Sequence, residues 1–467
     1  MDNNLVSPLS SENVETILRD IKKARKEGTI HHLYTYYQTK YGTSLSDNLV
    51  VPYKFQNKIV DLIIINHPKD AERLASDHIK KMPNLKQLLQ DSIISTTDNN
   101  QWECQRRNLT GAFNVYENLE PIIPVSAKRA FYCSDLLWDI SERGKTAVNI
   151  NNFFMNETMA QLQLSLFGFD SEFEEETNVR IRKALGDFEI KYSSEYIQNF
   201  LDNIQDAKGP LGKELSEYIK NHGTKEQNIG NSIIFTFAGH DTTGHTLTWL
   251  IYELCKNKKY QKILQDEVDQ FWIIQKGVDI KYNDLKRLPF MTKCILETLR
   301  LWPALANGTY RELEEDDYVH GKNAETIKVK KGTFIQIPNW SRHRNPELWG
   351  EDVNIFNPYR LFEEDENWNN NVIGTYNPNS ERFSPFTYGP RDCIGKNFAQ
   401  IEMRIILLYL LKSYSFTLTY KQDIMDRDKI MYNSFTMGPR NPDNETLEDN
   451  TNGLYVYVNK RNCISKI

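Results

Sequence analysis

The sequence of 467 residues has no basic excess, no closely spaced cysteine pair and no long apolar stretch near its first residue. Lys and Arg number 57 against 63 Asp and Glu, a net charge of −6 that argues against a general nucleic-acid binder, because phosphate contacts need a basic excess. The six cysteines lie far apart, so we expect neither a zinc ribbon nor a disulfide framework, and a reducing compartment fits best. Residues 1–20 carry charges throughout, so we expect no signal peptide, no transmembrane anchor, and a protein that is cytoplasmic or peripherally membrane-associated but not secreted.

No Pro-, Gly- or Ser-rich linker and no internal repeat divides the chain, which favours one large domain. We expect a polar segment without a membrane anchor over residues 1–28 and a single domain over 29–467. Long amphipathic segments between residues 101 and 300 predict a mainly α-helical protein with a minor β part. The other predicted features are a helix over 30–41, a strand over 59–65, a hairpin or pair of strands over 327–337, an irregular stretch over 345–390, a helix over 396–411, and a terminal sheet formed by 415–420 and 454–458.

The strongest chemical signal is the segment FTYGPRDCIG at residues 386–395, which leads directly into the predicted helix 396–411. Cys393 lies just before the helix N-terminus, where unpaired N–H groups and the positive end of the helix dipole stabilise a thiolate. Gly395 lets a flat ligand approach the backbone, Phe386 can cover the loop, and Arg391 supplies a cation for a carboxylate. A thiolate placed in this way can ligate an iron from one side and leave the opposite side open. A lone cysteine is usually a buried structural residue, but six positions with an assignable role within ten residues favour a ligand, namely Phe386, Gly389, Pro390, Arg391, Cys393 and Gly395.

A second signal is AGHDTTGH at residues 238–245, inside an apolar run, 233–255, that is otherwise typical of a buried helix. Gly239 and Gly244 weaken the helix by up to about 1 kcal/mol each relative to Ala. A Thr hydroxyl can also take over the hydrogen bond of a backbone carbonyl. We interpret the segment as a groove for a small molecule such as dioxygen, with Asp241 and Thr242 as a proton relay. A helix kink with satisfied polar side chains is the alternative.

Two further patterns place charged residues where they can act together. Glu297 and Arg300 share one face of a predicted helix, and their apolar neighbours predict burial. A buried ion pair needs further partners to stay charged, and Arg360 is a candidate third member. A separate set combines an indole N–H with guanidinium groups, and together its members can hold two propionates. This set is Trp102 and Arg106, four residues apart on one helix face, with Arg311 and Arg391.

These motifs, in this order, resemble those of the cytochrome P450 family. The resemblance rests on FxxGxRxCxG at 386–395, AGHDTT at 238–243, ExxR at 297–300 and the aromatic-Pro-Arg segment that ends at Arg360. It implies a single large helical domain with a small β subdomain, in which haem lies between the long central helix and the helix after the cysteine loop. It also implies that Cys393 is the axial thiolate ligand of the iron of haem b.

The resemblance further assigns roles to the residues that match the motifs. Thr242 and Asp241 are similar to the alcohol and acid of the distal proton relay, and Glu297, Arg300 and Arg360 to a structural triad. The remaining cofactor-binding residues that the resemblance implies are Trp102, Arg106, Arg311 and Arg391 as propionate partners, with Phe386, Gly395 and Ala238.

The function implied by the resemblance is that of a haem-thiolate monooxygenase. Such an enzyme inserts one oxygen atom of O2 into an apolar organic substrate, here a lipid, a sterol-like molecule or a xenobiotic. It takes two electrons from a redox partner, either an NADPH-dependent reductase or a ferredoxin-type protein. We also expect a monomer that binds no nucleic acid. The alternatives are an electron-independent haem-thiolate isomerase or dehydratase, and a haem-binding protein without catalysis.

Overall fold

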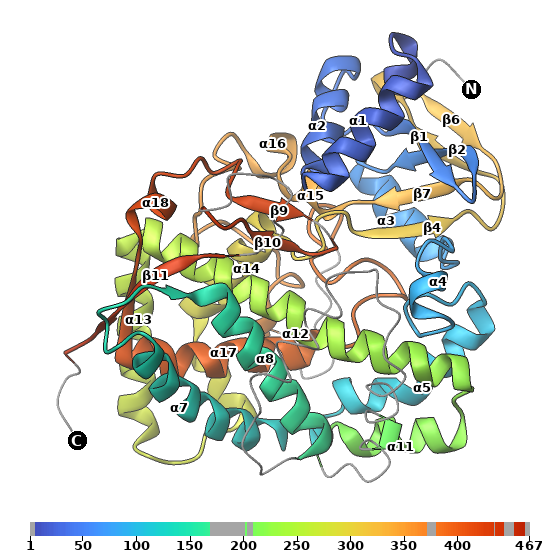
Figure 1. The fold of residues 1–467 in the computed structure, drawn as a ribbon. Helices are drawn as coiled ribbons and strands as arrows, with labels where there is room; N and C mark the ends of the chain where they lie inside the picture. The colour runs from blue at the N-terminus through green and yellow to red at the C-terminus, as the bar shows by residue number, and fades with distance from the viewer. Residues whose placement is uncertain are drawn as a thin grey trace.

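A computed structural model describes residues 5–168, 201–202, 209–370, 380–433, 435–442 and 453–462 of the chain. The described elements form a helical part around the long helix α12 (Lys225–Lys256) and a smaller part in which the first two helices and most strands gather (Figure 1). This is the predicted arrangement of a mainly α protein with a minor β part.

The smaller part is built on a four-stranded sheet with the order β1-β2-β7-β4. β1 (Leu49–Phe55) and β2 (Lys58–Ile64) form an antiparallel hairpin. β7 (Phe334–Ile337) joins β2 in parallel, and β4 (Thr309–Glu312) pairs with β7. The sheet therefore joins segments that lie more than 200 residues apart in the sequence.

The first two helices pack on this sheet. α1 (Val14–Lys26) and α2 (Ile30–Tyr41) contact each other and β1. Ile17 and Ile21 of α1 are buried in the same apolar cluster as Leu62 of β2, because α1 carries its apolar residues on one face. The predicted helix 30–41 is confirmed, and the division of the chain at residue 28 stays a prediction.

Helix α12 crosses the helical part, and α8 (Ile150–Phe167), α14 (Pro289–Leu301) and α17 (Lys396–Ser413) pack against it (Figure 1). It begins at a capping box in which Thr224 and Gln227 each accept the other's backbone N–H. Among the described helices, none has the length and apolar character needed to cross a bilayer.

The glycines of α12 allow close packing and do not interrupt the helix. A Cβ at Gly239 would lie 2.7 Å from Leu162, and one at Gly244 would lie 2.9 Å from Met155, both on α8. α12 continues without a break through residues 238–245, so the predicted weakening of its middle does not produce a kink. Packing by α8 compensates for the low helix propensity of glycine.

Of the two alternatives predicted over 327–337, the pair of strands is confirmed and the hairpin is not, because the two strands do not pair with each other. β6 (Thr326–Val329) pairs with β5 (Asp317–His320), whereas β7 pairs with β2 and β4. The terminal sheet is confirmed, because β8 (Tyr414–Leu418) pairs with β11 (Tyr455–Lys460). β3 (Val148–Asn149) adds a third strand that the sequence did not predict.

The remaining elements are mostly short. They are α3 (Pro68–Asp77), α4 (Lys86–Leu89), α5 (Asn99–Asn114), α6 (Tyr116–Leu119), α7 (Ile122–Ile140), α11 (Gly212–Asn221), α13 (Lys258–Gln275), α15 (Asn339–His343), α16 (Pro346–Trp349), α18 (Tyr420–Asp423), β9 (Met431–Asn433) and β10 (Met437–Pro439), with the 3-10 turns Pro8–Ser10, Tyr282–Arg287, Lys322–Ala324 and Trp368–Asn370.

Candidate active site

A cavity of about 500 Å³ lies where α12, the cysteine loop and the strand β4 meet. Its floor includes Cys393 and Ile394, and Thr242 faces it from α12. The apolar residues that line the cavity include Phe235, Ala238, Leu305 and Phe435.

The cysteine loop is closed by a hydrogen bond of 2.8 Å from the N–H of Cys393 to the carbonyl of Phe386. Gly389 has a φ of +72°, and a Cβ there would lie 2.5 Å from the carbonyl oxygen of Ala75 in α3. A side chain would therefore be both strained and blocked at this position, so the motif needs glycine. Phe386 packs against the main apolar core outside the cavity lining. A Cβ at Gly395 would meet no protein atom within 4 Å.

Cys393 is accessible from the cavity, but the protein around it stabilises the negative charge of a thiolate less well than water does. Burial raises the pKa of the Cys393 thiol, while the N–H of Gly395 and the cations Lys396 and Arg106 act in the opposite direction. The helix terminus therefore does not by itself yield the predicted low thiol pKa. Coordination of a metal ion deprotonates a thiol outright, so the site suits a metal-bound thiolate.

On the opposite side of the cavity, Ala238 is exposed in the middle of an otherwise buried helix. Thr242 lies one turn further along the same face, and its hydroxyl donates to the carbonyl of Ala238 at 3.1 Å. This back-bond is the one predicted for a threonine in this segment. The Thr242 hydroxyl, whose proton can exchange, therefore lies on the cavity wall.

Asp241 does not line the cavity. Its carboxylate lies 3.5 Å from Nδ1 of His245 and accepts a hydrogen bond from the hydroxyl of Thr436. Burial would raise the pKa of Asp241, but His245, His240 and Thr436 together lower it to about 2. Asp241 is therefore ionised and bound to His245 and Thr436, so the structure places only Thr242 of the predicted relay pair on the cavity wall.

A group of cations meets at one end of the cavity. Arg391 and Lys81 line the cavity, and Arg311 lies directly behind them. Arg311 donates to the hydroxyl oxygen of Thr309 at 2.9 Å, and Lys81 donates to the same oxygen at 2.6 Å. Burial and the charges of Arg311 and Arg391 lower the pKa of Lys81 well below its usual value. Burial and the charge of Arg391 likewise lower the pKa of Arg311.

These cations keep buried N–H groups without a hydrogen-bond acceptor. They are Nε and Nη2 of Arg311 and Nε of Arg391 among the described residues. Buried donors are normally paired, so this end of the cavity fits an anionic ligand that brings its own oxygens. Two carboxylates of a propionate-bearing macrocycle meet that requirement.

The other two predicted propionate partners lie beside this group. The guanidinium of Arg391 stacks 4.8 Å from the ring centre of Trp102, and both residues line the cavity. Arg106 also lines the cavity, but it donates to the carbonyl of Asp392 at 2.8 Å and to its carboxylate. Lys396 contacts the same carboxylate. Arg106 therefore fixes the cysteine loop directly.

The structure brings Glu297, Arg300 and Arg360 together in a cluster in which Glu297 and Arg300 are fully buried and Arg360 is partly exposed. Arg300 donates two hydrogen bonds of 2.8 Å to the two carboxylate oxygens of Glu297, and Arg360 donates a third at 3.2 Å. The third nitrogen of Arg300, Nη1, donates to the carbonyl of His343 at 2.8 Å. This satisfies the requirement that a buried ion pair has additional partners.

Residues that the sequence analysis missed connect this cluster to the cysteine loop. Nε2 of His343 accepts the N–H of Ser384 at 3.1 Å, and Arg342 donates to the Ser384 hydroxyl at 2.7 Å. Ser384 lies two residues before Phe386. Lys81 and Asp392 were missed as well, and only Asp392, which lies inside the cysteine motif, had a signal that could have revealed it.

Comparison with known proteins agrees with this geometry. The family model for cytochrome P450 matches residues 183–443, which is more than half of the chain. The chain belongs to the cytochrome P450 family. Human cytochrome P450 4F8 is 24% identical over 459 residues, a match that covers 84% of each chain. Rat cytochrome P450 4F4 is 25% identical, with 70% of this chain and 69% of the relative covered. Cytochrome P450 CYP13A6 of Caenorhabditis elegans is 32% identical over 239 residues, covering 49% of this chain and 43% of the relative.

Membership places this P450 among the haem-thiolate monooxygenases, oxidoreductases that draw electrons from a redox partner. The fold class predicted from the sequence is confirmed. The residues present fit the haem group, because Cys393 forms part of the cavity floor and, among the described residues, Arg311 and Arg391 keep N–H groups without an acceptor at one end of the cavity.

Proposed function

We propose that this P450 inserts one oxygen atom of O2 into an apolar organic substrate with two electrons supplied from outside. The observation that carries the proposal is the convergence of three features on one cavity: the Cys393 sulfur, the Thr242 hydroxyl, and an apolar wall that includes Phe235 and Phe435. A lipid, a sterol-like molecule or a xenobiotic would fit such a wall. The electrons would come from an NADPH-dependent reductase or a ferredoxin-type protein.

Haem b with a thiolate ligand supplies, when bound, the capacity to cleave O–O bonds and transfer oxygen. Cys393 would be its axial ligand. Arg391 and Lys81, which line the cavity, and Arg311 behind them would hold its propionates, because Arg311 and Arg391 keep buried N–H groups without an acceptor among the described residues. Trp102 would stack on Arg391 and keep that guanidinium in place.

The chain's own contribution to the chemistry is the control of water and protons. Thr242 holds a proton at Oγ1 on the cavity wall, where the hydroxyl can donate to a bound ligand and be resupplied by water. Asp241 lies outside the cavity lining, and its charge orients His245 and the hydroxyl of Thr436. The apolar wall keeps bulk water from the reacting atoms.

The function is tested with the purified haem-loaded protein. Compounds from a library of lipids, sterols and xenobiotics that change the haem absorption are first selected as ligands. We then expect each accepted substrate to disappear only when O2, NADPH and an added reductase, or a ferredoxin with its own reductase, are all present. Substrate loss that needs no electron donor would instead indicate the isomerase or dehydratase alternative. Ligands that bind without being consumed under any condition would indicate a haem-binding protein without catalysis.

Thr242→Ala is expected to separate electron consumption from product formation. Loss of the hydroxyl removes the proton donor on the cavity wall, so we expect product per electron to fall by at least about tenfold and peroxide to rise. Product, NADPH consumption and peroxide are measured in the same reaction.

Thr242→Ser keeps the hydroxyl and should retain coupling. Thr246→Ala is the matched control, because Thr246 makes the same back-bond, to the carbonyl of Thr242 at 2.8 Å, but does not line the cavity. Unchanged coupling in Thr242→Ala would contradict the assignment.

A further inference from the structure

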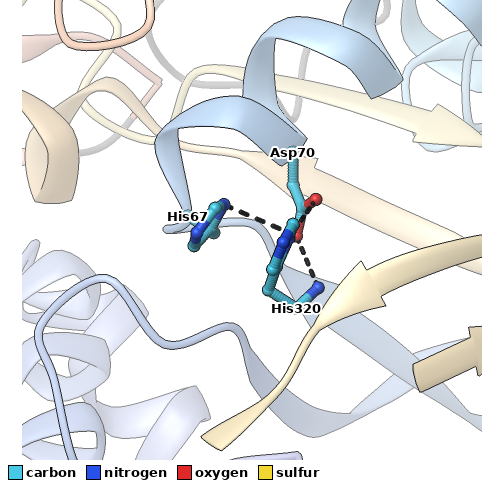
Figure 2. Close-up of side chains that lie close together, drawn as sticks. All are labelled: His67, Asp70 and His320. Atoms are coloured by element: carbon cyan, nitrogen blue, oxygen red, sulfur yellow. Dashed lines mark hydrogen bonds and ion pairs between the residues drawn. The ribbon is translucent and has the colours of Figure 1, made fainter. Parts of the chain in front are cut away.

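Away from the cavity, His67, Asp70 and His320 meet near the surface, where the N-terminus of α3 reaches the end of β5. Figure 2 shows the carboxylate of Asp70 directed at the two imidazole rings. One nitrogen from each ring and one carboxylate oxygen all lie within 4.8 Å of one another. This is the one such group of His, Cys, Asp or Glu side chains within the part of the chain that the structure describes.

The distances within the cluster leave a gap on one side. Nδ1 of His320 lies 2.8 Å from Oδ1 of Asp70, but Nδ1 of His67 lies 4.0 Å from Oδ2. The two rings are nearly parallel, with centres 3.9 Å apart. Nδ1 of His67 is buried and has no hydrogen-bond partner among the described residues. A buried ring nitrogen directed at a carboxylate beyond hydrogen-bond distance indicates that a ligand belongs between them.

A single buried side chain holds all three residues in place. The amide of Asn48 donates to Oδ2 of Asp70 at 2.6 Å and to the carbonyl of His320 at 2.8 Å. Its oxygen accepts the N–H of His67 at 3.0 Å. The N–H of His320 donates to Asp70 as well, at 2.7 Å. Ligating carboxylates in metal sites are fixed by outer hydrogen bonds of this kind, so the arrangement is that of a preformed site.

The charges around the cluster are compatible with a cation. Arg73 lies 3.8 Å from Oδ1 of Asp70, but its Nη1 is bound to Asp317 at 2.7 Å and its Nη2 donates to the carbonyl of Tyr318. Asp317 also contacts His78. The positive charge of Arg73 is thus offset by its own carboxylate partner, and the charge of Asp70 stays available.

We propose that His67, Asp70 and His320 bind a divalent transition-metal ion, and that Zn²⁺ is the best match. Two imidazole nitrogens and one carboxylate oxygen form a donor set that Zn²⁺ prefers, with a fourth position left for water. The side chains of His67 and His320 are 23% and 34% exposed, so both rings can rotate to bring the nitrogens to ligand distance. For the ion to bind at Nδ1 of His320, the neutral ring carries its one proton on Nε2, which leaves the Nδ1 lone pair free to coordinate. A bound ion would join α3 to the β5–β6 pair.

The proposal is tested with the haem-loaded protein and Zn²⁺ alone. Isothermal titration calorimetry should show one zinc site, and anomalous scattering at the zinc edge should locate the ion between the three side chains. We expect His67→Gln and His320→Gln each to weaken binding by at least about tenfold, and the double variant to lose one zinc per chain. Both positions are partly exposed, so these variants keep the fold.

His222→Gln is the matched control, because His222 is an exposed histidine outside the cluster. It should bind zinc as the unmodified chain does. The proposal is overturned if the double variant retains the same stoichiometry and affinity, if the anomalous signal lies at another group such as a cysteine, or if the unmodified chain binds no zinc.

Discussion

Cys393→Ser is expected to abolish the thiolate-type spectrum of the reduced, carbon-monoxide-treated protein and to reduce substrate turnover to background. A serine hydroxyl is not ionised at neutral pH and cannot donate the electron density by which a thiolate favours O–O cleavage. The loop itself should survive, because the hydrogen bond from residue 393 to the carbonyl of Phe386 uses the backbone. Retention of haem by the cationic end of the cavity is therefore compatible with loss of the thiolate signature.

The spectrum of the ferrous carbon monoxide complex is compared between Cys393→Ser and the unmodified protein, together with haem content per chain. Cys104→Ser is the matched control, since Cys104 is another free, partly accessible cysteine that lies on α5 and does not line the cavity. We expect this control to keep both the spectrum and the turnover. If Cys393→Ser retained the thiolate-type spectrum, the assignment of the axial ligand would be wrong.

The parts of the site that could be predicted from sequence are those encoded by contiguous residues. The cysteine loop needs glycine at 389 because the local backbone is left-handed, which the Gly-Pro pair of the motif indicates, and because α3 approaches it closely, which the motif does not indicate. Glu297 and Arg300 lie three residues apart, which is enough to place them on one helix face. Arg360 is a candidate because a buried ion pair needs a further partner, and the motif order of the family supports the same residue.

The relay pair shows where a contiguous motif misleads. Successive residues of an α-helix point about 100° apart, so neighbours do not always line a cavity together: Ile234 and Phe235 both do so here, whereas of Asp241 and Thr242 only Thr242 does. Ala238 and Thr242, four residues apart, do face it together. Thr436, the partner of Asp241, comes from a distant turn that sequence spacing does not indicate.

Residues that depend on long-range pairing could not be predicted. Lys81 reaches the cavity because its backbone forms a bridge with Arg311, more than 200 residues away. β7 pairs in parallel with β2, a strand in the first hundred residues, and not with its sequence neighbour β6. In both cases the choice of partner is made by the packing of the sheet and not by the local pattern of apolar residues.

Glu297→Ala is expected to destabilise the protein by about 3–5 kcal/mol, because it leaves the guanidinium of Arg300 buried without a counter-charge, while Arg360 keeps only its ion pair with Asp352. Arg300 and Glu297 are both fully buried, and the side chain of Arg360 is nearly so. The loss should also loosen the cysteine loop, since Arg300 fixes the carbonyl of His343 and His343 in turn accepts the N–H of Ser384. We therefore expect haem release and unfolding to occur together at lower urea concentration.

Urea unfolding is followed by haem absorption and by tryptophan fluorescence in the same samples. Asp266→Ala is the matched control, because it also removes one carboxylate from a helical ion pair, with Lys262, but at an exposed site where the loss costs about 0.3–0.5 kcal/mol. A triple variant, Glu297→Leu with Arg300→Met and Arg360→Met, distinguishes the cause. Because this variant removes the buried charges together with their partner, it should be less destabilised than Glu297→Ala if unpaired charge dominates the cost. An equal or greater loss in the triple variant would show that the cluster acts mainly through its hydrogen bonds to the backbone of residues 343 and 357.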